Sequence, residues 1–309
     1  MGDIKALGYL AVSTTDLERW RTLAFDVLDL GQGADSSNDV LYMRMDERAY
    51  RLIVERGESD CLTAIGWEVR DELALDRVRH TLHSHSIPSR DLSDDEAHAR
   101  HIDGGIALVD PTGQSLEIFH GAGLDHSAVS TKFRTEFVTG SLGLGHIVIP
   151  STDHVATITF YRDVLGFHTR GAFPFPSAPG MPPLRIQFMG INPRHHSLAI
   201  MPAPQMGPGI VHIMVEVSTM DAVGQALERC GEYGFAISST LGRHTNDKML
   251  SFYLRAPGGW DIEYGYDGLS VTEDHYLPEL ISADSYWGHD WSGSEPLACT
   301  LPPDAPPQS

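Results

Sequence analysis

The chain has 309 residues, 41% hydrophobic and 21% charged, a composition typical of a globular protein with room for two ordinary domains. Its formal net charge of −20 argues against nucleic acid and anionic membranes as partners, since both bind basic patches. No run approaches the roughly 18 apolar residues that span a bilayer, and the N-terminus lacks the pattern of a secretory signal. The three cysteines form neither a disulfide framework nor a zinc-ligand spacing, so we expect a cytoplasmic protein.

The chain contains an internal repeat. Residues 7–31, LGYLAVSTTDLERWRTLAFDVLDLG, resemble residues 144–167, LGHIVIPSTDHVATITFYRDVLGF. Each segment begins with a predicted strand and continues into an amphipathic helix. The Ser, Thr and Asp side chains between the two supply the oxygen that caps the first N–H groups of a helix.

Two further pairs of segments extend the repeat. Residues 64–82 resemble residues 212–230, and both are predicted to form a strand followed by a helix. Residues 110–121, DPTGQSLEIFHG, resemble residues 256–268, APGGWDIEYGYDG, and this match aligns a glutamate in one with a glutamate in the other. Self-similarity of this kind indicates a fold built from repeated units.

The repeats divide the chain into four strand–helix–strands modules, near residues 5–56, 60–121, 142–202 and 208–267. We predict an α+β fold of two domains, each made of two βαβββ modules whose mixed sheets curl around a central cleft. Residues 1–134 form the N-terminal domain and residues 135–292 the C-terminal domain, with the polar stretch 122–140 joining them. The Pro-rich tail, residues 293–309, is expected to be loose.

The stretch from Gly242 to Gly265 places chemically active residues on a predicted hairpin. Apolar and polar residues alternate over residues 250–254, as in a half-buried strand, and the Ala-Pro-Gly-Gly sequence at 256–259 predicts a turn. Residues 261–265 then return as the antiparallel partner. Glu263 lies on this second strand, and a buried carboxylate requires a partner from elsewhere in the chain.

His146, His212 and Glu263 are the predicted metal ligands. Each lies on the first or last strand of its module, and equivalent strands of related modules meet at the centre of such a fold. Two imidazoles and one carboxylate leave positions of a six-coordinate metal open, which suits Fe(II) that binds a substrate and O₂ together. Mn(II) also fits this ligand set.

The N-terminal modules provide an internal control. At the positions that match these three ligands they have Tyr9, Ala64 and Glu117, so two of the three ligands are missing. We therefore expect the N-terminal half to bind no metal. The contrast indicates that the C-terminal set serves chemistry and is not required by the fold.

Several motifs resemble one family. The segments GLGHIVI (143–149), NPRHHSLAI (192–200), GIVHIMVEV (209–217) and the stretch 242–265 are similar to those of the type I extradiol (meta-cleaving) dioxygenases. These enzymes belong to the vicinal oxygen chelate superfamily and are typified by 2,3-dihydroxybiphenyl 1,2-dioxygenase. The resemblance implies Fe(II), a catechol substrate, O₂ as cosubstrate and a homo-oligomer, often an octamer.

The resemblance also implies roles for polar residues around the metal, which are an acid/base His196, the hydrogen-bonding His244 and Tyr253, and the neighbouring Asn246 and Asp247. Successive side chains of a strand alternate, so only one of each adjacent pair is expected to face the site. The choice between His195 and His196 stays open at this point.

An apolar pocket is expected beside the metal. Residues 170–189 carry five prolines and two glycines and are predicted to form a rigid, apolar, non-helical loop. The resemblance implies that Val148, Phe188 and Val211 line the pocket. Such a pocket favours a bulky hydrophobic substituent on the catechol, of biphenyl type, of another bicyclic or polycyclic type, or of steroid type.

Two other functions are compatible with this kind of fold. One is a different vicinal oxygen chelate enzyme, such as an isomerase or a thiol transferase, which predicts a metal site without His196, His244 and Tyr253. The other is a non-catalytic protein that binds a hydrophobic ligand, which predicts that metal ligands are missing. Fold analogy alone does not separate these functions, and the site residues do.

Overall fold

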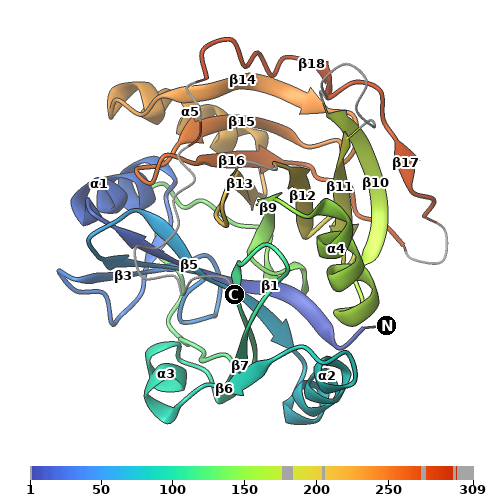
Figure 1. The fold of residues 1–309 in the computed structure, drawn as a ribbon. Helices are drawn as coiled ribbons and strands as arrows, with labels where there is room; N and C mark the ends of the chain where they lie inside the picture. Colours follow the sequence, from blue (N-terminus) through green and yellow to red (C-terminus); the bar gives the residue numbers. More distant parts are fainter. Residues whose placement is uncertain (1, 176–183, 204–205, 273–275, 295–296, 298–309) are drawn as a thin grey trace.

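The structure is a computed structural model, which describes residues 2–175, 184–203, 206–272, 276–294 and 297 (Figure 1). The first half of the chain forms one mixed sheet with the strand order β2-β3-β4-β1-β5-β8-β7-β6. Its strands are β1 (Ile4–Thr14), β2 (Gly31–Gln32), β3 (Val40–Arg44), β4 (Leu52–Arg56), β5 (Cys61–Val69), β6 (Ser89–Asp91), β7 (Gly104–Val109) and β8 (Ser115–His120).

The second half forms a second mixed sheet with the strand order β17-β10-β11-β12-β9-β13-β16-β15-β14-β18. Its strands are β9 (Gly145–Ser151), β10 (His168–Phe175), β11 (Leu184–Gly190), β12 (Leu198–Pro202), β13 (His212–Val217), β14 (Ile237–His244), β15 (Leu250–Arg255), β16 (Asp261–Tyr266), β17 (Glu279–Leu280) and β18 (Ser285–Trp287).

The helices of the first and third modules begin where the Ser, Thr and Asp clusters predict them. The helices and helical turns of the described chain are α1 (Leu17–Thr22) with the π-helical turn η1 (Leu23–Val27), α2 (Glu72–Ser84), α3 (Asp94–Ala99), the 3₁₀ turn η2 (Gly140–Leu142), α4 (His154–Thr159) with the π-helical turn η3 (Phe160–Val164), and α5 (Met220–Glu232). The Asp16 side chain accepts a hydrogen bond from the Arg19 N–H at 2.9 Å, and Asp153 accepts one from Ala156 at 3.0 Å. The two repeats therefore begin their helices with the same cap.

The sheet topology confirms the predicted fold class. In each sheet the two modules meet at their first strands, because β1 pairs antiparallel with β5 and β9 pairs antiparallel with β13. The last strand of each module lies parallel to the first strand of the same module, as in β8 beside β5 and β16 beside β13. Helix α3 and strands β17 and β18 are additions to the βαβββ pattern. The boundary between residues 134 and 135 stays a prediction.

One sequence prediction about local structure is wrong. The predicted loop over residues 170–189 begins and ends as strands, since β10 and β11 pair antiparallel from His168 opposite Gly190 to Phe175 opposite Leu184. Proline suits this hairpin because β10 lies near the edge of the sheet, where a missing N–H is tolerated. Residues 176–183 lie outside the described residues. Within the Pro-rich tail, the same holds for residues 295–296 and 298–309.

The hairpin predicted over residues 250–265 is confirmed. β15 pairs antiparallel with β16, and Tyr253 lies opposite Glu263. The turn between them contains Gly259 with a φ of 77°, a left-handed conformation that glycine adopts without strain. This register fixes which side chains of the two strands share a face.

The two halves of the chain share one hydrophobic core. The indole rings of Trp20 and Trp260 lie 5.4 Å apart, and the Tyr264 hydroxyl donates a 3.0 Å hydrogen bond to the Leu28 carbonyl. This packing covers the back of β16, the strand that carries Glu263. Over the described ranges, no helix combines the length and the apolar character needed to cross a membrane.

Candidate metal centre

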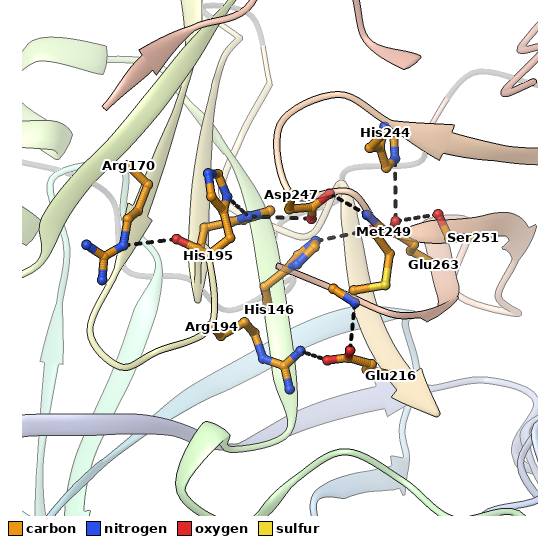
Figure 2. Close-up of polar contacts among 12 residues, drawn as sticks. His146, Arg170, Arg194, His195, Glu216, His244, Asp247, Met249, Ser251 and Glu263 are labelled. Atoms are coloured by element: carbon orange, nitrogen blue, oxygen red, sulfur yellow. Dashed lines mark hydrogen bonds and ion pairs between the residues drawn. The ribbon is translucent and has the colours of Figure 1, made fainter. Parts of the chain in front are cut away.

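Three side chains converge at the middle of the C-terminal sheet, where β9, β13 and β16 are neighbours (Figure 1). His146 on β9 and Glu263 on β16 both lie opposite Met214 of β13, and His212 is two residues earlier on that strand. All three side chains share one face, because residues two apart on a strand point the same way. His146 Nε2 lies 3.1 Å from His212 Nε2 and 3.3 Å from Glu263 Oε2, as Figure 2 shows for the second pair.

The donor atoms of this cluster fit a divalent metal. His212 Nε2 lies 3.5 Å from Glu263 Oε2, so the three donor–donor distances run from 3.1 to 3.5 Å. Adjacent ligands at bond lengths of about 2.1 Å are about 3.0 Å apart in an octahedral site. Two imidazoles and a carboxylate on one face of the metal leave the opposite positions open. The arrangement therefore suits a metal that binds substrate directly.

The protonation states also suit metal binding. Burial lowers the pKa of His212 to about 3, and the nearby Glu263 carboxylate opposes this shift only in part. Burial alone raises the pKa of Glu263, but hydrogen bonds from His146 and His244 outweigh burial and hold that pKa well below its usual range. A neutral imidazole and an ionised carboxylate are the forms that bind a metal.

Two other groups of side chains have ligand atoms close together, namely His146, His196 and Asp247, and His244, Asp284 and His289. In the second group both His289 nitrogens are engaged, since Nε2 lies 3.0 Å from the Ser251 carbonyl and Nδ1 lies 2.6 Å from the Ser285 hydroxyl. In the first group burial raises the pKa of Asp247, which disfavours the anionic ligand form. Of these three groups, His146, His212 and Glu263 therefore have the ligand atoms and protonation states that suit a metal best.

The equivalent place in the N-terminal sheet is filled by protein. Tyr9 and Glu117 both lie opposite Gly66, in the register that His146 and Glu263 have with Met214. The Tyr9 hydroxyl donates a hydrogen bond to Glu117, and the Arg100 guanidinium lies 3.1 Å from the same carboxylate. The cavity beside these side chains measures about 10 Å³. In this half, the Tyr9 side chain therefore occupies the place of a metal, and the Arg100 guanidinium supplies the positive charge beside Glu117.

The structure distinguishes the two histidines of the adjacent pair. The His196 ring stacks on the His146 ring with centroids 4.0 Å apart, and His196 lines the cavity in front of the metal ligands. His195 instead points toward Tyr276, whose hydroxyl lies 2.7 Å from His195 Nε2. Burial and the neighbouring imidazole of His146 lower the pKa of His196 well below its usual range, so that ring is neutral.

His244 and Tyr253 lie on the other side of the cluster. His244 Nε2 is 2.7 Å from the Tyr253 hydroxyl. It also lies 3.4 Å from Glu263 Oε1, and Figure 2 shows this pair. Burial alone lowers the pKa of His244, but its hydrogen bonds to Asp284 and Glu263 outweigh burial and raise that pKa well above its usual value. A protonated His244 has an Nε2–H to donate to the Tyr253 oxygen.

Asn246 and Asp247 both line the cavity, contrary to the expectation that only one of them faces it. The expectation rested on strand alternation, but β14 ends at His244 and β15 begins at Leu250, so both residues lie in the connecting loop.

The cavity in front of the metal ligands has a volume of about 660 Å³. Its walls are mostly apolar, and they are formed by Val148, Phe173, Ile186, Phe188, Ala199, Met201, Val211 and Trp291. Val148, Phe188 and Val211 are among the residues that the sequence predicts to line it.

Strand register shows how far the cavity wall extends from the ligands. Met201 lies opposite Pro150 on β9, four residues beyond His146 and two beyond Val148, which pairs with His212. At about 3.3 Å per residue, the backbone at Pro150 lies about 13 Å along the strand from His146 and about 7 Å from Val148. Ile186 lines the same cavity as Met201.

Several residues of the site are not identified by the sequence analysis. The Ser251 hydroxyl donates a 2.6 Å hydrogen bond to Glu263 Oε1, and the His289 ring lies 4.0 Å from the His244 ring. Asp284, Ser285, Gly288, His289 and Trp291 also line the cavity, and they come from a segment that follows the fourth module. Comparison of repeats does not reach this segment. Its one signal is a histidine among aromatic residues, YWGHDW, in an otherwise polar and Pro-rich region.

Two family models match the chain. Residues 143–264 match the Glyoxalase/Bleomycin resistance protein/Dioxygenase superfamily, and residues 7–57 match Dihydroxybiphenyl dioxygenase BphC D1. The first match contains all three proposed metal ligands. The second covers the first module of the N-terminal half.

Similar proteins cover almost the whole chain. An iron-dependent extradiol dioxygenase from Rhodococcus jostii is 42% identical over 95% of this chain and 99% of its own length. A biphenyl-2,3-diol 1,2-dioxygenase from Metapseudomonas furukawaii is 36% identical over 93% of each chain. The crystal structure of a halotolerant catechol dioxygenase superposes with a TM-score of 0.87 at 30% identity, over 94% of this chain and 95% of that one.

Proposed function

The chain belongs to the extradiol dioxygenases, and on that premise we propose that it cleaves a catechol with a bulky apolar substituent at an Fe(II) site formed by His146, His212 and Glu263. The observation that carries the proposal is the position of this cluster: three donor atoms 3.1 to 3.5 Å apart, at the end of an apolar cavity of about 660 Å³. The isomerase and binding-protein alternatives are set aside, because relatives over nearly the full length are ring-cleaving dioxygenases.

Fe(II) held by His146, His212 and Glu263 would bind the catechol and O₂ and would mediate electron transfer between them. Around it, Tyr253 and the protonated His244 stabilise negative charge on a catechol oxygen by preorganised hydrogen bonds. Ser251 donates to Glu263 and fixes the orientation of that carboxylate. The apolar walls exclude water from the reacting ring.

His196 is proposed as the acid/base residue. It lies against His146, on the side of the cluster opposite His244, and faces the cavity. Its neutral ring has a free nitrogen to accept a proton, and it returns that proton when the O–O bond breaks. Asn246 and Asp247 add polar contacts beside the catechol.

The substrate class follows from the shape of the cavity. Relatives are named for biphenyl-2,3-diol, 3-methylcatechol and 1,2-dihydroxynaphthalene, which differ in the size of the group beside the diol. The cavity volume of about 660 Å³ and its apolar walls favour a second ring over a methyl group. The homo-oligomeric state, the cytoplasmic location and the domain boundary stay predictions from the sequence.

The identity of the metal is tested by reconstitution. Metal-free protein is reloaded without oxygen with Fe(II) or with Mn(II), and 2,3-dihydroxybiphenyl and air are then supplied. We expect faster formation of yellow ring-fission product, per bound metal, with Fe(II), because two imidazoles and a carboxylate with open positions suit Fe(II) that activates O₂. Equal or faster turnover with Mn(II) would show that the Fe(II) assignment is wrong.

Replacing Ile186 with Trp should select against bulky catechols. Ile186 forms part of the far wall, so a larger side chain there collides with a second ring and leaves the catechol ring free. Overpacking costs about 1 to 3 kcal/mol, which corresponds to a fall of about fivefold to 150-fold in kcat/KM for 2,3-dihydroxybiphenyl. The measurement is the ratio of kcat/KM for 2,3-dihydroxybiphenyl to that for unsubstituted catechol.

The matched control for this variant is Leu184→Trp. Leu184 lies two residues away on the same strand, and the lining of the cavity does not include it. The substrate ratio should change with Ile186→Trp and stay the same with Leu184→Trp. Equal losses for both catechols in the Ile186 variant would contradict the proposed placement of the substituent.

A further inference from the structure

A buried chain of hydrogen bonds leads from the cavity to the far side of the adjacent histidine pair. His196 Nδ1 lies 3.0 Å from His195 Nδ1, and His195 Nε2 lies 2.7 Å from the Tyr276 hydroxyl. That hydroxyl donates to the backbone carbonyl of Arg170 at 2.8 Å. His195 and His196 are both buried, so each of these contacts must pair a donor with an acceptor.

The direction of every bond in this chain follows from its last member. A carbonyl oxygen only accepts, so the single proton of the Tyr276 hydroxyl points to the Arg170 carbonyl. His195 Nε2 must then carry the proton that bonds to the Tyr276 oxygen. Burial lowers the pKa of His195 to about 3, so its ring is neutral and its Nδ1 carries no proton. His195 Nδ1 therefore accepts, and the proton between the two rings belongs to His196 Nδ1.

We infer that Tyr276 and His195 are positioning residues that hold His196 in the Nδ1–H tautomer, so that its Nε2 lone pair is the one available in the cavity. This inference rests on the proposed function, because it concerns how His196 meets the substrate. A neutral histidine without such a chain has two tautomers, and one of them presents an N–H to the cavity in place of a lone pair.

Other contacts support the same tautomer. An Asp247 carboxyl oxygen lies 3.8 Å from His196 Nδ1, and an oxygen beside that nitrogen favours an N–H there over a lone pair. The Arg170 side chain also contacts the pair, because its Nε donates a 3.1 Å hydrogen bond to the His195 carbonyl. The backbone and the side chain of one strand residue thus fix both His195 and Tyr276.

The first test locates the protons directly by neutron diffraction from crystals of the full-length, deuterium-exchanged protein. We expect deuterium on His196 Nδ1 and on His195 Nε2, and a Tyr276 hydroxyl that points to the Arg170 carbonyl. Deuterium on His196 Nε2 would overturn the inference. This result does not depend on turnover, so it is separate from the question whether the protein cleaves catechols.

The second test uses two variants of His195. In His195→Asn the amide oxygen occupies the place of Nδ1 and still accepts from His196, whereas His195→Leu offers no acceptor. We expect kcat to stay within about threefold of wild type for the Asn variant and to fall by at least about 10-fold for the Leu variant, with equal metal content. Equal kcat in the two variants would contradict the inference.

A matched pair of tyrosines completes the design. Tyr276→Phe removes the hydroxyl at the end of the chain, and we expect kcat to fall by about fivefold to 10-fold with little change in KM. Tyr286→Phe removes a hydroxyl from the same C-terminal segment, one that accepts a 2.6 Å hydrogen bond from Lys248 Nζ. We expect unchanged kcat for this variant. If wild-type protein opens no catechol ring, the proposed function fails, and the neutron result still decides the tautomer.

Discussion

Replacing Glu263 with Gln should lower metal affinity by more than about 100-fold and abolish ring cleavage. Loss of a partner that only orients a ligand costs about 10- to 100-fold in metal affinity, and loss of a charged ligand exceeds that range. Glu263 is 1% exposed, and its carboxylate lies 3.3 Å from His146 Nε2 and 3.5 Å from His212 Nε2. Metal content after gel filtration and O₂ uptake with 2,3-dihydroxybiphenyl are the two measurements.

The N-terminal half provides the control for this variant. Glu117→Gln changes the same residue type at the equivalent register position, where the carboxylate already bonds to Tyr9 and pairs with Arg100. We expect this variant to retain its metal and its activity. Loss of metal from the Glu117 variant, or full retention by the Glu263 variant, would show that the metal site is placed in the wrong half.

Replacing His196 with Phe should lower kcat by about 10² to 10⁴ while metal content stays the same, because positioned proton transfer contributes a factor of this size. A phenyl ring keeps the stacking contact on His146 and removes both nitrogens. The measurements are kcat under saturating catechol and O₂, together with iron content. His83→Phe is the matched control, since His83 is exposed on α2 in the other half of the chain. A kcat within a few-fold of wild type would show that His196 takes no part in proton transfer.

The fold class can be predicted from the sequence because the internal repeats show the order of strands and helices in each module. Each module shows its helix cap and its strand pattern, and two matched modules imply the symmetric pairing that β9 and β13 display. The same symmetry brings His146, His212 and Glu263 together, since residues at equivalent positions of central strands share one face. The local signals and the global topology agree here.

The parts of the site that the sequence does not predict lie outside the repeats. His289 and Asp284 come from the segment after the fourth module, which reaches the cavity because β18 pairs with β14 and because the Asp284 carbonyl accepts from Thr245. Such contacts depend on long-range pairing and leave no periodic pattern. Arg100, whose guanidinium pairs with Glu117, likewise follows α3, which is an addition to the βαβββ pattern.

The most direct test of the central claim is the stoichiometry of the reaction. Protein reconstituted with Fe(II) is mixed with a known amount of 2,3-dihydroxybiphenyl in an oxygen electrode, and consumed O₂ and ring-opened product are measured together. Extradiol cleavage predicts one O₂ consumed and one ring-opened product formed per catechol, with both lost in Glu263→Gln. Iron retained without O₂ uptake, for this and for steroid and monocyclic catechols, would contradict the account.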